Sequence, residues 1–153
     1  MKGWNETSLR GWAFVPIRLI VGFGFLVHGA AKLQRGPEAF GTLLQQIGVP
    51  LPTATAWVVT LAEVFGGIAI LVGAFVALAS IPLIATMLVA MFAVHLRHGF
   101  SSVNTIGLSD SGPLYGPPGY EINLLYIAGL LGLVVGGAGR FSVDRWRARR
   151  GSR

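Results

Sequence analysis

The hydrophobic residues of this chain fall into four long blocks that short polar stretches separate. The blocks cover residues 12–33, 55–75, 77–95 and 120–137. Crossing a hydrocarbon core of about 30 Å takes roughly 20 helical residues. Backbone groups in lipid must be hydrogen-bonded internally, which favours a helix for each block. The pattern therefore predicts an all-α protein, an integral membrane four-helix bundle.

The connections between the blocks differ in character. In residues 35–53, which read RGPEAFGTLLQQIGVPLPT, apolar side chains recur at helical spacing until two prolines end the pattern; the apolar positions are Phe40, Leu43, Leu44 and Ile47. We expect a short amphipathic helix that lies on the membrane surface. Spans two and three should form a helical hairpin, because little more than residues 73–75 joins them. Residues 97–119 are rich in Gly, Ser and Pro, which predicts a loop, either ordered or flexible, and not a helix.

Composition supports the membrane assignment. The mean hydropathy is +0.66, and only 12% of the residues are charged, about half the share of a soluble domain. We interpret residues 1–153 as one transmembrane domain with a basic tail over residues 138–153.

The basic residues gather beside a membrane span, and no soluble basic module is present, so we expect no nucleic-acid partner. The chain has no cysteine, which excludes thiolate catalysis and cysteine-ligated iron–sulfur clusters on this chain.

Basic residues near the span ends predict the orientation. With four spans, both termini and the turn between spans two and three share one side. That side carries Lys2, Arg10 and six arginines of the tail: Arg140, Arg145, Arg147, Arg149, Arg150 and Arg153. The other side carries only Lys32, at its edge, with Arg35 and Arg97. Cytoplasmic loops carry the excess of Lys and Arg, so we expect both termini to be cytoplasmic.

Four charged or titratable residues lie within the first two spans. Arg18, His28 and Lys32 fall within an arc of roughly 80° on the first span, so this face should contact protein or a water-filled cavity. Glu63 is the one carboxylate inside the second span, where it costs about 2.5–3.5 kcal/mol without a partner. Counting helical rise, we prefer Arg18 as its partner, with His28 one layer outward. Glu63, His28 and Arg18 are therefore the candidate catalytic set.

Small residues on two spans predict close helix packing. Gly22 and Gly29 share the polar face of the first span, where they let a neighbouring backbone approach. In the fourth span, Gly132 and Gly136 form a GxxxG pair, for which tight packing is the simplest interpretation.

A second polar group gathers where the spans end on the outer side. His95, Arg97 and His98 finish the third span, while Tyr120, Glu121 and Asn123 begin the fourth. We expect a candidate cofactor-binding pocket there, formed by His28, Lys32, His95 and Glu121. His95 and His98 have a spacing that suits shared metal ligation, but Glu121 is the only obvious carboxylate nearby. Hydrated interfacial histidines are the alternative, and we predict no metal site.

Several segments, taken in order, resemble the DoxX family of small four-helix bacterial membrane proteins. They are Arg18-Leu19 followed by HGAAKL at 28–33, FGTLLQQIGVP at 40–50, AEVFGGIAILVG at 62–73, GYEINLLY at 119–126 and FSVDRW at 141–146. The resemblance implies a multi-pass protein of the bacterial inner membrane. Relatives in the family include a subunit of a thiosulfate:quinone oxidoreductase and members of redox complexes that respond to oxidative stress. It therefore implies redox partner subunits and a quinone.

Three functions stay open at this point. The first is a membrane subunit of a redox complex, in which Glu63 or His28 donates a proton to a quinone. The second is a small transporter or channel, because buried ionisable residues also mark transport pathways. The third is a structural scaffold, in which a buried ion pair only fixes helix register. Membrane lipids, other subunits or further copies of the chain are the expected partners, and whether the chain itself catalyses a reaction is left open.

Overall fold

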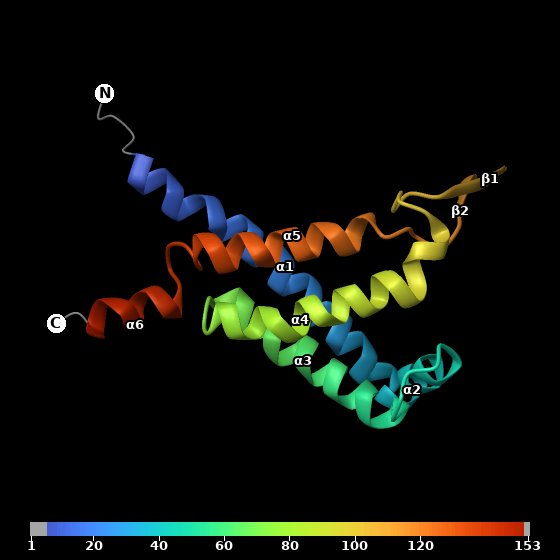
Figure 1. The fold of residues 1–153 in the computed structure, drawn as a ribbon. Coiled ribbons are helices and arrows are strands. Elements are labelled where there is room, and N and C mark those ends of the chain that lie inside the picture. The colour runs from blue at the N-terminus through green and yellow to red at the C-terminus, as the bar shows by residue number, and fades with distance from the viewer. Residues whose placement is uncertain (1–5, 152–153) are drawn as a thin grey trace.

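The computed structural model describes residues 6–151, which form a mainly helical protein (Figure 1). The α-helices are α1 (Glu6–Arg35), α2 (Pro37–Gln46), α3 (Pro52–Val72), α4 (Val76–Ala90), α5 (Glu121–Gly136) and α6 (Val143–Gly151). The end of α4 continues into a π-helical turn, η1 (Met91–His95), and a 3₁₀ turn, η2 (Leu96–His98). All four apolar blocks and the short connecting helix thus form where the sequence predicts them.

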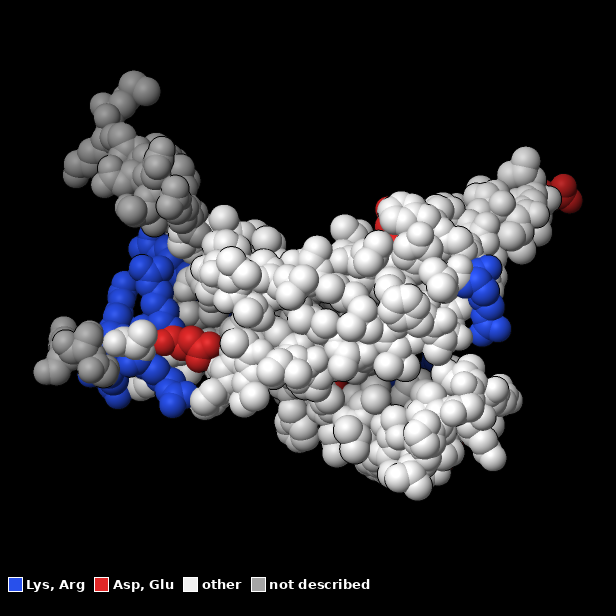
Figure 2. Space-filling model, in the orientation of Figure 1, with Lys and Arg blue, Asp and Glu red and all other residues white. Residues whose placement is uncertain are grey.

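The helices have the length and composition of membrane spans. Three of them are long and apolar enough to cross a bilayer, over Gly11–Arg35, Pro52–Val72 and Val76–His98. Figure 2 shows Lys and Arg gathered at the α6 end of the molecule, with a wide uncharged surface between the two ends. The all-α membrane fold is therefore confirmed. Because α5 is apolar but has only 16 residues, the fourth crossing stays a prediction.

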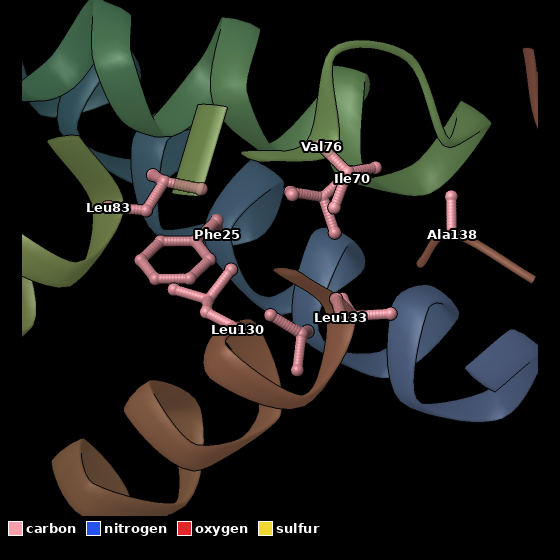
Figure 3. Packing of buried hydrophobic residues seen from close by; sticks show 8 residues of the cluster. Phe25, Ile70, Val76, Leu83, Leu130, Leu133 and Ala138 are labelled. Atoms are coloured by element: carbon pink, nitrogen blue, oxygen red, sulfur yellow. The ribbon is translucent and has the colours of Figure 1, made fainter. Parts of the chain in front are cut away.

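Four helices share one hydrophobic core. Figure 3 shows that Phe25 of α1 lies against Leu83 of α4 and Leu130 of α5, while Ile70 of α3 lies near Leu133 of α5. All five side chains are fully buried. The ring of Phe25 also meets the ring of Tyr126 edge to face, with centroids 5.1 Å apart. The apolar faces of α1, α3, α4 and α5 are therefore packed together along the part of their lengths nearer to α6.

Helices α1 and α3 touch through their backbones. A Cβ atom on Gly67 would lie 2.7 Å from the amide nitrogen of Leu26 and 2.9 Å from the carbonyl oxygen of Gly22. A Cβ on Gly29 would lie 2.9 Å from the amide nitrogen of Val64. No side chain fits at these three points, so glycine lets the two helices approach closely. The close packing predicted from Gly22 and Gly29 is confirmed.

The GxxxG pair of α5 packs less tightly than the sequence predicts. A Cβ on Gly136 would collide with the ring of Phe14, but a Cβ on Gly132 would meet nothing within 4 Å. Gly132 therefore makes no close contact inside this chain, and the prediction is wrong for this residue.

Hydrogen bonds attach α6 to the turn between α3 and α4. Gly73 ends α3 in the left-handed conformation (φ 68°), and the chain reverses within residues 73–75, as predicted for a helical hairpin. The carboxylate of Asp144 accepts hydrogen bonds from the backbone N–H groups of Phe75 (2.8 Å) and Val76 (3.0 Å). These N–H groups begin α4 and have no partner within the helix. Asp144 thus caps α4 and fixes the start of α6.

The long connection between α4 and α5 contains a β-hairpin that the sequence analysis missed. Strands β1 (Thr105–Ser109) and β2 (Gly112–Tyr115) pair antiparallel, with Leu108 opposite Pro113. Figure 1 shows the hairpin projecting from the end of the molecule opposite to α6. The prediction that the connection is not a helix holds for the hairpin.

The backbone contact between α1 and α3 gives the first testable prediction. We expect Gly67→Ala to lower the free energy of unfolding by roughly 1–3 kcal/mol, because the new methyl group forces two backbones apart. Gly132→Ala is the matched control, which should leave stability unchanged or raise it by up to about 1 kcal/mol. Thermal or denaturant unfolding in detergent micelles measures both. Equal effects of the two substitutions would contradict the close approach.

Candidate functional site

A cavity of about 750 Å³ opens at the end of the helices opposite to α6. It forms because α3 and α4 diverge away from their tight turn (Figure 1). In Figure 2 it is visible as a hollow between the α2–α3 lobe and the α4–α5 arm. Most of its wall is aliphatic, and the polar side chains that reach it are His28, Lys32, Thr55, Glu63, Thr86, His95, Asn123 and Tyr126. Such a mainly apolar cavity with a few converging polar groups is typical of a ligand site.

Helix α2 closes one side of the cavity. The side chains that the sequence predicts to face the membrane surface (Phe40, Leu43, Leu44 and Ile47) line the cavity instead. A hydrogen bond from Nε1 of Trp57 to Oε1 of Glu38 (3.2 Å) ties α2 to α3. The predicted helix is confirmed, but its apolar face covers the site within the molecule.

The floor of the cavity carries an ion pair between Lys32 of α1 and Glu63 of α3. Nζ of Lys32 donates to Oε2 of Glu63. The Glu63 side chain is 2% exposed and that of Lys32 22% exposed, so the lysine faces the cavity from above a buried carboxylate. Nζ of Lys32 also lies 4.8 Å from the ring centroid of Phe40 on α2, a distance at which a cation is attracted to the ring.

The pairing of Glu63 corrects the prediction that Arg18 is its partner. The guanidinium of Arg18 lies at the other end of α1, where it donates to the carbonyl oxygens of Ala138 (2.8 Å), Phe141 (3.3 Å) and Arg140 (3.4 Å). These carbonyl groups belong to the segment that follows α5. Arg18 is 4% exposed and does not line the cavity. Its contacts fasten the chain after α5 onto α1, away from the other candidate residues.

Two histidines reach the cavity from different helices. His28 of α1 is exposed on the cavity wall. His95 ends the π-helical turn η1, and its Nδ1 lies 3.0 Å from the carbonyl oxygen of Pro118. Because a carbonyl oxygen only accepts, Nδ1 of His95 is the donor in this hydrogen bond, which leaves Nε2 for a second partner. Such π-turns are frequent at functional sites, and this one places His95 beside the cavity.

Glu121 does not belong to the cavity. Its Oε2 accepts hydrogen bonds from the backbone N–H of Ser102 (2.9 Å) and from the Ser102 hydroxyl (2.7 Å). It therefore fixes the loop before the hairpin, and the prediction that it lines the same pocket as His28, Lys32 and His95 is wrong. The other three predicted pocket residues do line one cavity.

Two further groups of the site lie on α5: Asn123, which the sequence analysis placed in the outer polar group but not in the pocket, and Tyr126, which it missed. Asn123 is 4% exposed, and its Nδ2 donates to the carbonyl oxygen of Met87 at 3.5 Å. Tyr126 lies one turn further along, and a Cβ on Gly24 would lie 1.8 Å from its hydroxyl oxygen. Gly24 thus provides the room for this ring between α1 and α5. The spacing of Asn123 and Tyr126 by three positions was the available signal, since it puts both on one face of the helix.

No three His, Cys, Asp or Glu side chains come together within the described residues in a way that could hold a metal ion. His95 and His98 accordingly have no third such ligand among them. The chemistry of the cavity therefore rests on the Lys32–Glu63 pair, the two histidines and the amide of Asn123.

Comparison with known proteins gives two matches. The DoxX family model matches residues 13–96. The uncharacterized membrane protein Rv3486 of Mycobacterium tuberculosis is 30% identical over 145 residues, which cover 89% of this chain and 82% of that protein. No solved structure matches.

The ion pair gives the second prediction. Lys32→Met leaves the Glu63 carboxylate buried without a partner, and we expect the free energy of unfolding to fall by roughly 3–5 kcal/mol. The double variant Lys32→Met with Glu63→Gln removes both charges and should regain most of that loss. Unfolding of each variant in the same detergent measures this. A double variant no more stable than Lys32→Met alone would contradict the pairing.

Proposed function

Because this chain belongs to the DoxX family, we propose that it is a membrane subunit of a redox complex and that its cavity binds a quinone. The observation that supports this most directly is the cavity itself, an apolar space of about 750 Å³ that ends on a buried ion pair. The position of the site, among membrane-spanning helices, suits a ligand that reaches the protein through the bilayer.

The residues present fit a quinone. Pockets for small organic ligands measure roughly 300–1,000 Å³ and combine apolar walls with a few polar groups. The aliphatic residues of α3 and α4, among them Val58, Val59 and Val89, suit a ring and an isoprenoid chain. At the polar end, Nζ of Lys32 and Nδ2 of Asn123 are hydrogen-bond donors that suit a quinone carbonyl oxygen.

Each polar residue then has a distinct role. A bound quinone supplies reversible chemistry of two electrons and two protons. Lys32 orients the head group by a charge-assisted hydrogen bond, and Glu63 holds the lysine in place. His28 and His95 carry imidazole nitrogens that can donate or accept a hydrogen bond, which suits them to proton transfer at the head group. The electrons would come from a partner subunit, while Arg18 and Glu121 serve the fold rather than the ligand.

We also propose that α5 crosses the membrane as a fourth span and that both termini lie in the bacterial cytoplasm. The arginines of α6 support this, because basic residues favour the cytoplasmic side. Lys2 and the side chains of Arg10 and Arg153, which entered the same argument, lie outside the described residues.

A scaffold role is the second candidate, and a specific observation favours it. The Lys32–Glu63 pair joins α1 and α3 beside the backbone contacts of Gly29 and Gly67, so it fixes the register of these helices. Buried polar pairs have this use in some proteins. In that case the pair would matter for folding but not for binding.

The third prediction separates the two roles. Ala85 and Ala128 are both exposed alanines on apolar helices, but only Ala85 lines the cavity. In nanodiscs, we expect Ala85→Trp to weaken binding of a short-chain benzoquinone by roughly tenfold or more, because the indole occupies part of the cavity. Ala128→Trp should bind as the unmodified chain does. Equilibrium titration with the quinone measures both affinities.

Glu63→Gln completes the test. If the cavity binds a quinone through Lys32, Glu63→Gln removes the negative partner of the lysine. The affinity for the quinone then changes in a protein that still folds. Binding that is unaffected by both Ala85→Trp and Glu63→Gln, together with lower stability of Glu63→Gln, would contradict the quinone proposal and support a scaffold.

A further inference from the structure

A second hollow, of about 640 Å³, lies at the α6 end of the molecule between α1 and the α5–α6 connection. Its wall consists of Gly11, Phe14, residues 136–139, Ser142, Asp144 and Arg145. The connection reads GGAG, and Gly137 (φ 81°) and Gly139 (φ 74°) adopt a conformation that L side chains rarely take. The hollow is therefore walled largely by backbone, which leaves room for a ligand to approach the main chain.

Two arginines converge at this hollow. A Cβ atom on Gly11 would lie 2.9 Å from Cγ of Arg140 and 3.2 Å from Nη1 of Arg145. Both side chains thus lie near Gly11. Arg145 is among the residues that line the hollow, whereas the guanidinium of Arg140 lies over the rings of Trp12 (5.3 Å) and Phe141 (6.0 Å). Arginine presents several N–H donors in a planar fork that matches the oxygens of a phosphate group.

The acidic residue in the wall does not cancel this charge at the hollow. Both carboxylate oxygens of Asp144 accept hydrogen bonds from the backbone of Phe75 and Val76, at the start of α4. Asp144 is therefore committed to capping a helix, where its charge interacts favourably with the helix dipole.

The hollow lies at the level where the membrane spans end. The apolar block of α1 begins at Trp12 in the sequence, and α5 ends at Gly136. Exposed aromatic rings surround this level: Trp12 and Phe141 meet edge to face with centroids 5.4 Å apart, and Phe75 lies 4.6 Å beneath the guanidinium of Arg147. Aromatic rings of this kind, Trp above all, mark the boundary between lipid and water.

We propose that this hollow is a binding site for the phosphate head group of an anionic phospholipid. Arg145 holds the phosphate oxygens, and Phe14, which also lines the hollow, contacts the glycerol and upper acyl region. The observation that distinguishes a site from a general attraction is the hollow itself, which Arg145 lines with Nη1 close to Gly11. The proposal is independent of the quinone cavity, which lies at the opposite end of the helices.

Native mass spectrometry of the full chain, titrated with phosphatidylglycerol or phosphatidylcholine, tests this proposal. We expect one phosphatidylglycerol to bind in clear preference to phosphatidylcholine. Arg145→Gln should weaken phosphatidylglycerol binding by roughly tenfold or more, since a charge-assisted hydrogen bond to the phosphate is lost. Arg150→Gln is the charge-matched control. Arg150 stacks on Trp146 with its guanidinium 3.8 Å from the ring and is not part of the wall, so its loss should change affinity less than about twofold.

A second variant tests the hollow without removing a charge. Gly11→Leu would place a side chain in the hollow from α1, where the nearest atoms belong to the Arg140 and Arg145 side chains, and we expect the preference for phosphatidylglycerol to be lost. Equal losses from Arg145→Gln and Arg150→Gln, with none from Gly11→Leu, would overturn the site in favour of diffuse attraction. Displacement of the lipid by millimolar inorganic phosphate would overturn a lipid as the source of the phosphate group.

Discussion

The close contact between α1 and α3 determines where the charged groups of this protein lie. At Gly22, Gly29 and Gly67 the two backbones meet with no space for a side chain, which fixes both the distance and the register of the helices. Gly29 lies against Val64 and Glu63, so the carboxylate faces the α1 turn that ends in Lys32. Arg18 lies beyond the other end of this contact, where its Nη1 would be 2.6 Å from a Cβ on Gly73. A shift of α3 by one helical turn relative to α1 would leave the Glu63 carboxylate buried without a cation beside it.

The same arrangement separates two environments along the helices. Toward α6, the core of Phe25, Ile70 and Leu133 is closed, and Arg18 and Asp144 use their charges to satisfy backbone groups. Toward the hairpin, α3 and α4 diverge and the space between them stays open. Arg18 and Asp144 therefore serve the fold, because polar groups taken out of water must be hydrogen-bonded. Charges at the open end are positioned to meet a ligand.

Much of this architecture follows from the sequence, but the pairing of its charges does not. Uninterrupted apolar blocks of spanning length allow little except membrane helices, and the spacing of Phe40, Leu43 and Leu44 gave α2. Counting helical rise estimates the depth of Arg18 or Glu63 but not the register and rotation of two packed helices, which close glycine contacts decide. The direction of the Glu121 side chain could not be predicted either, because its hydrogen bond to the backbone of Ser102 depends on the conformation of the loop. The hairpin was hidden because glycine, serine and proline outweigh the alternation of Ile106 and Leu108.

The most direct test of the account is to identify the small molecules that stay with the protein when it is purified from its native membrane in mild detergent. If the cavity above Lys32 and Glu63 binds a lipophilic molecule with a polar, carbonyl-bearing head, mass spectrometry will find a quinone at close to one per chain. The Ala85→Trp protein, in which an indole occupies part of the cavity, will lack it. Ordinary phospholipid alone, in equal amount in both proteins, would contradict the claim that the cavity is a quinone site.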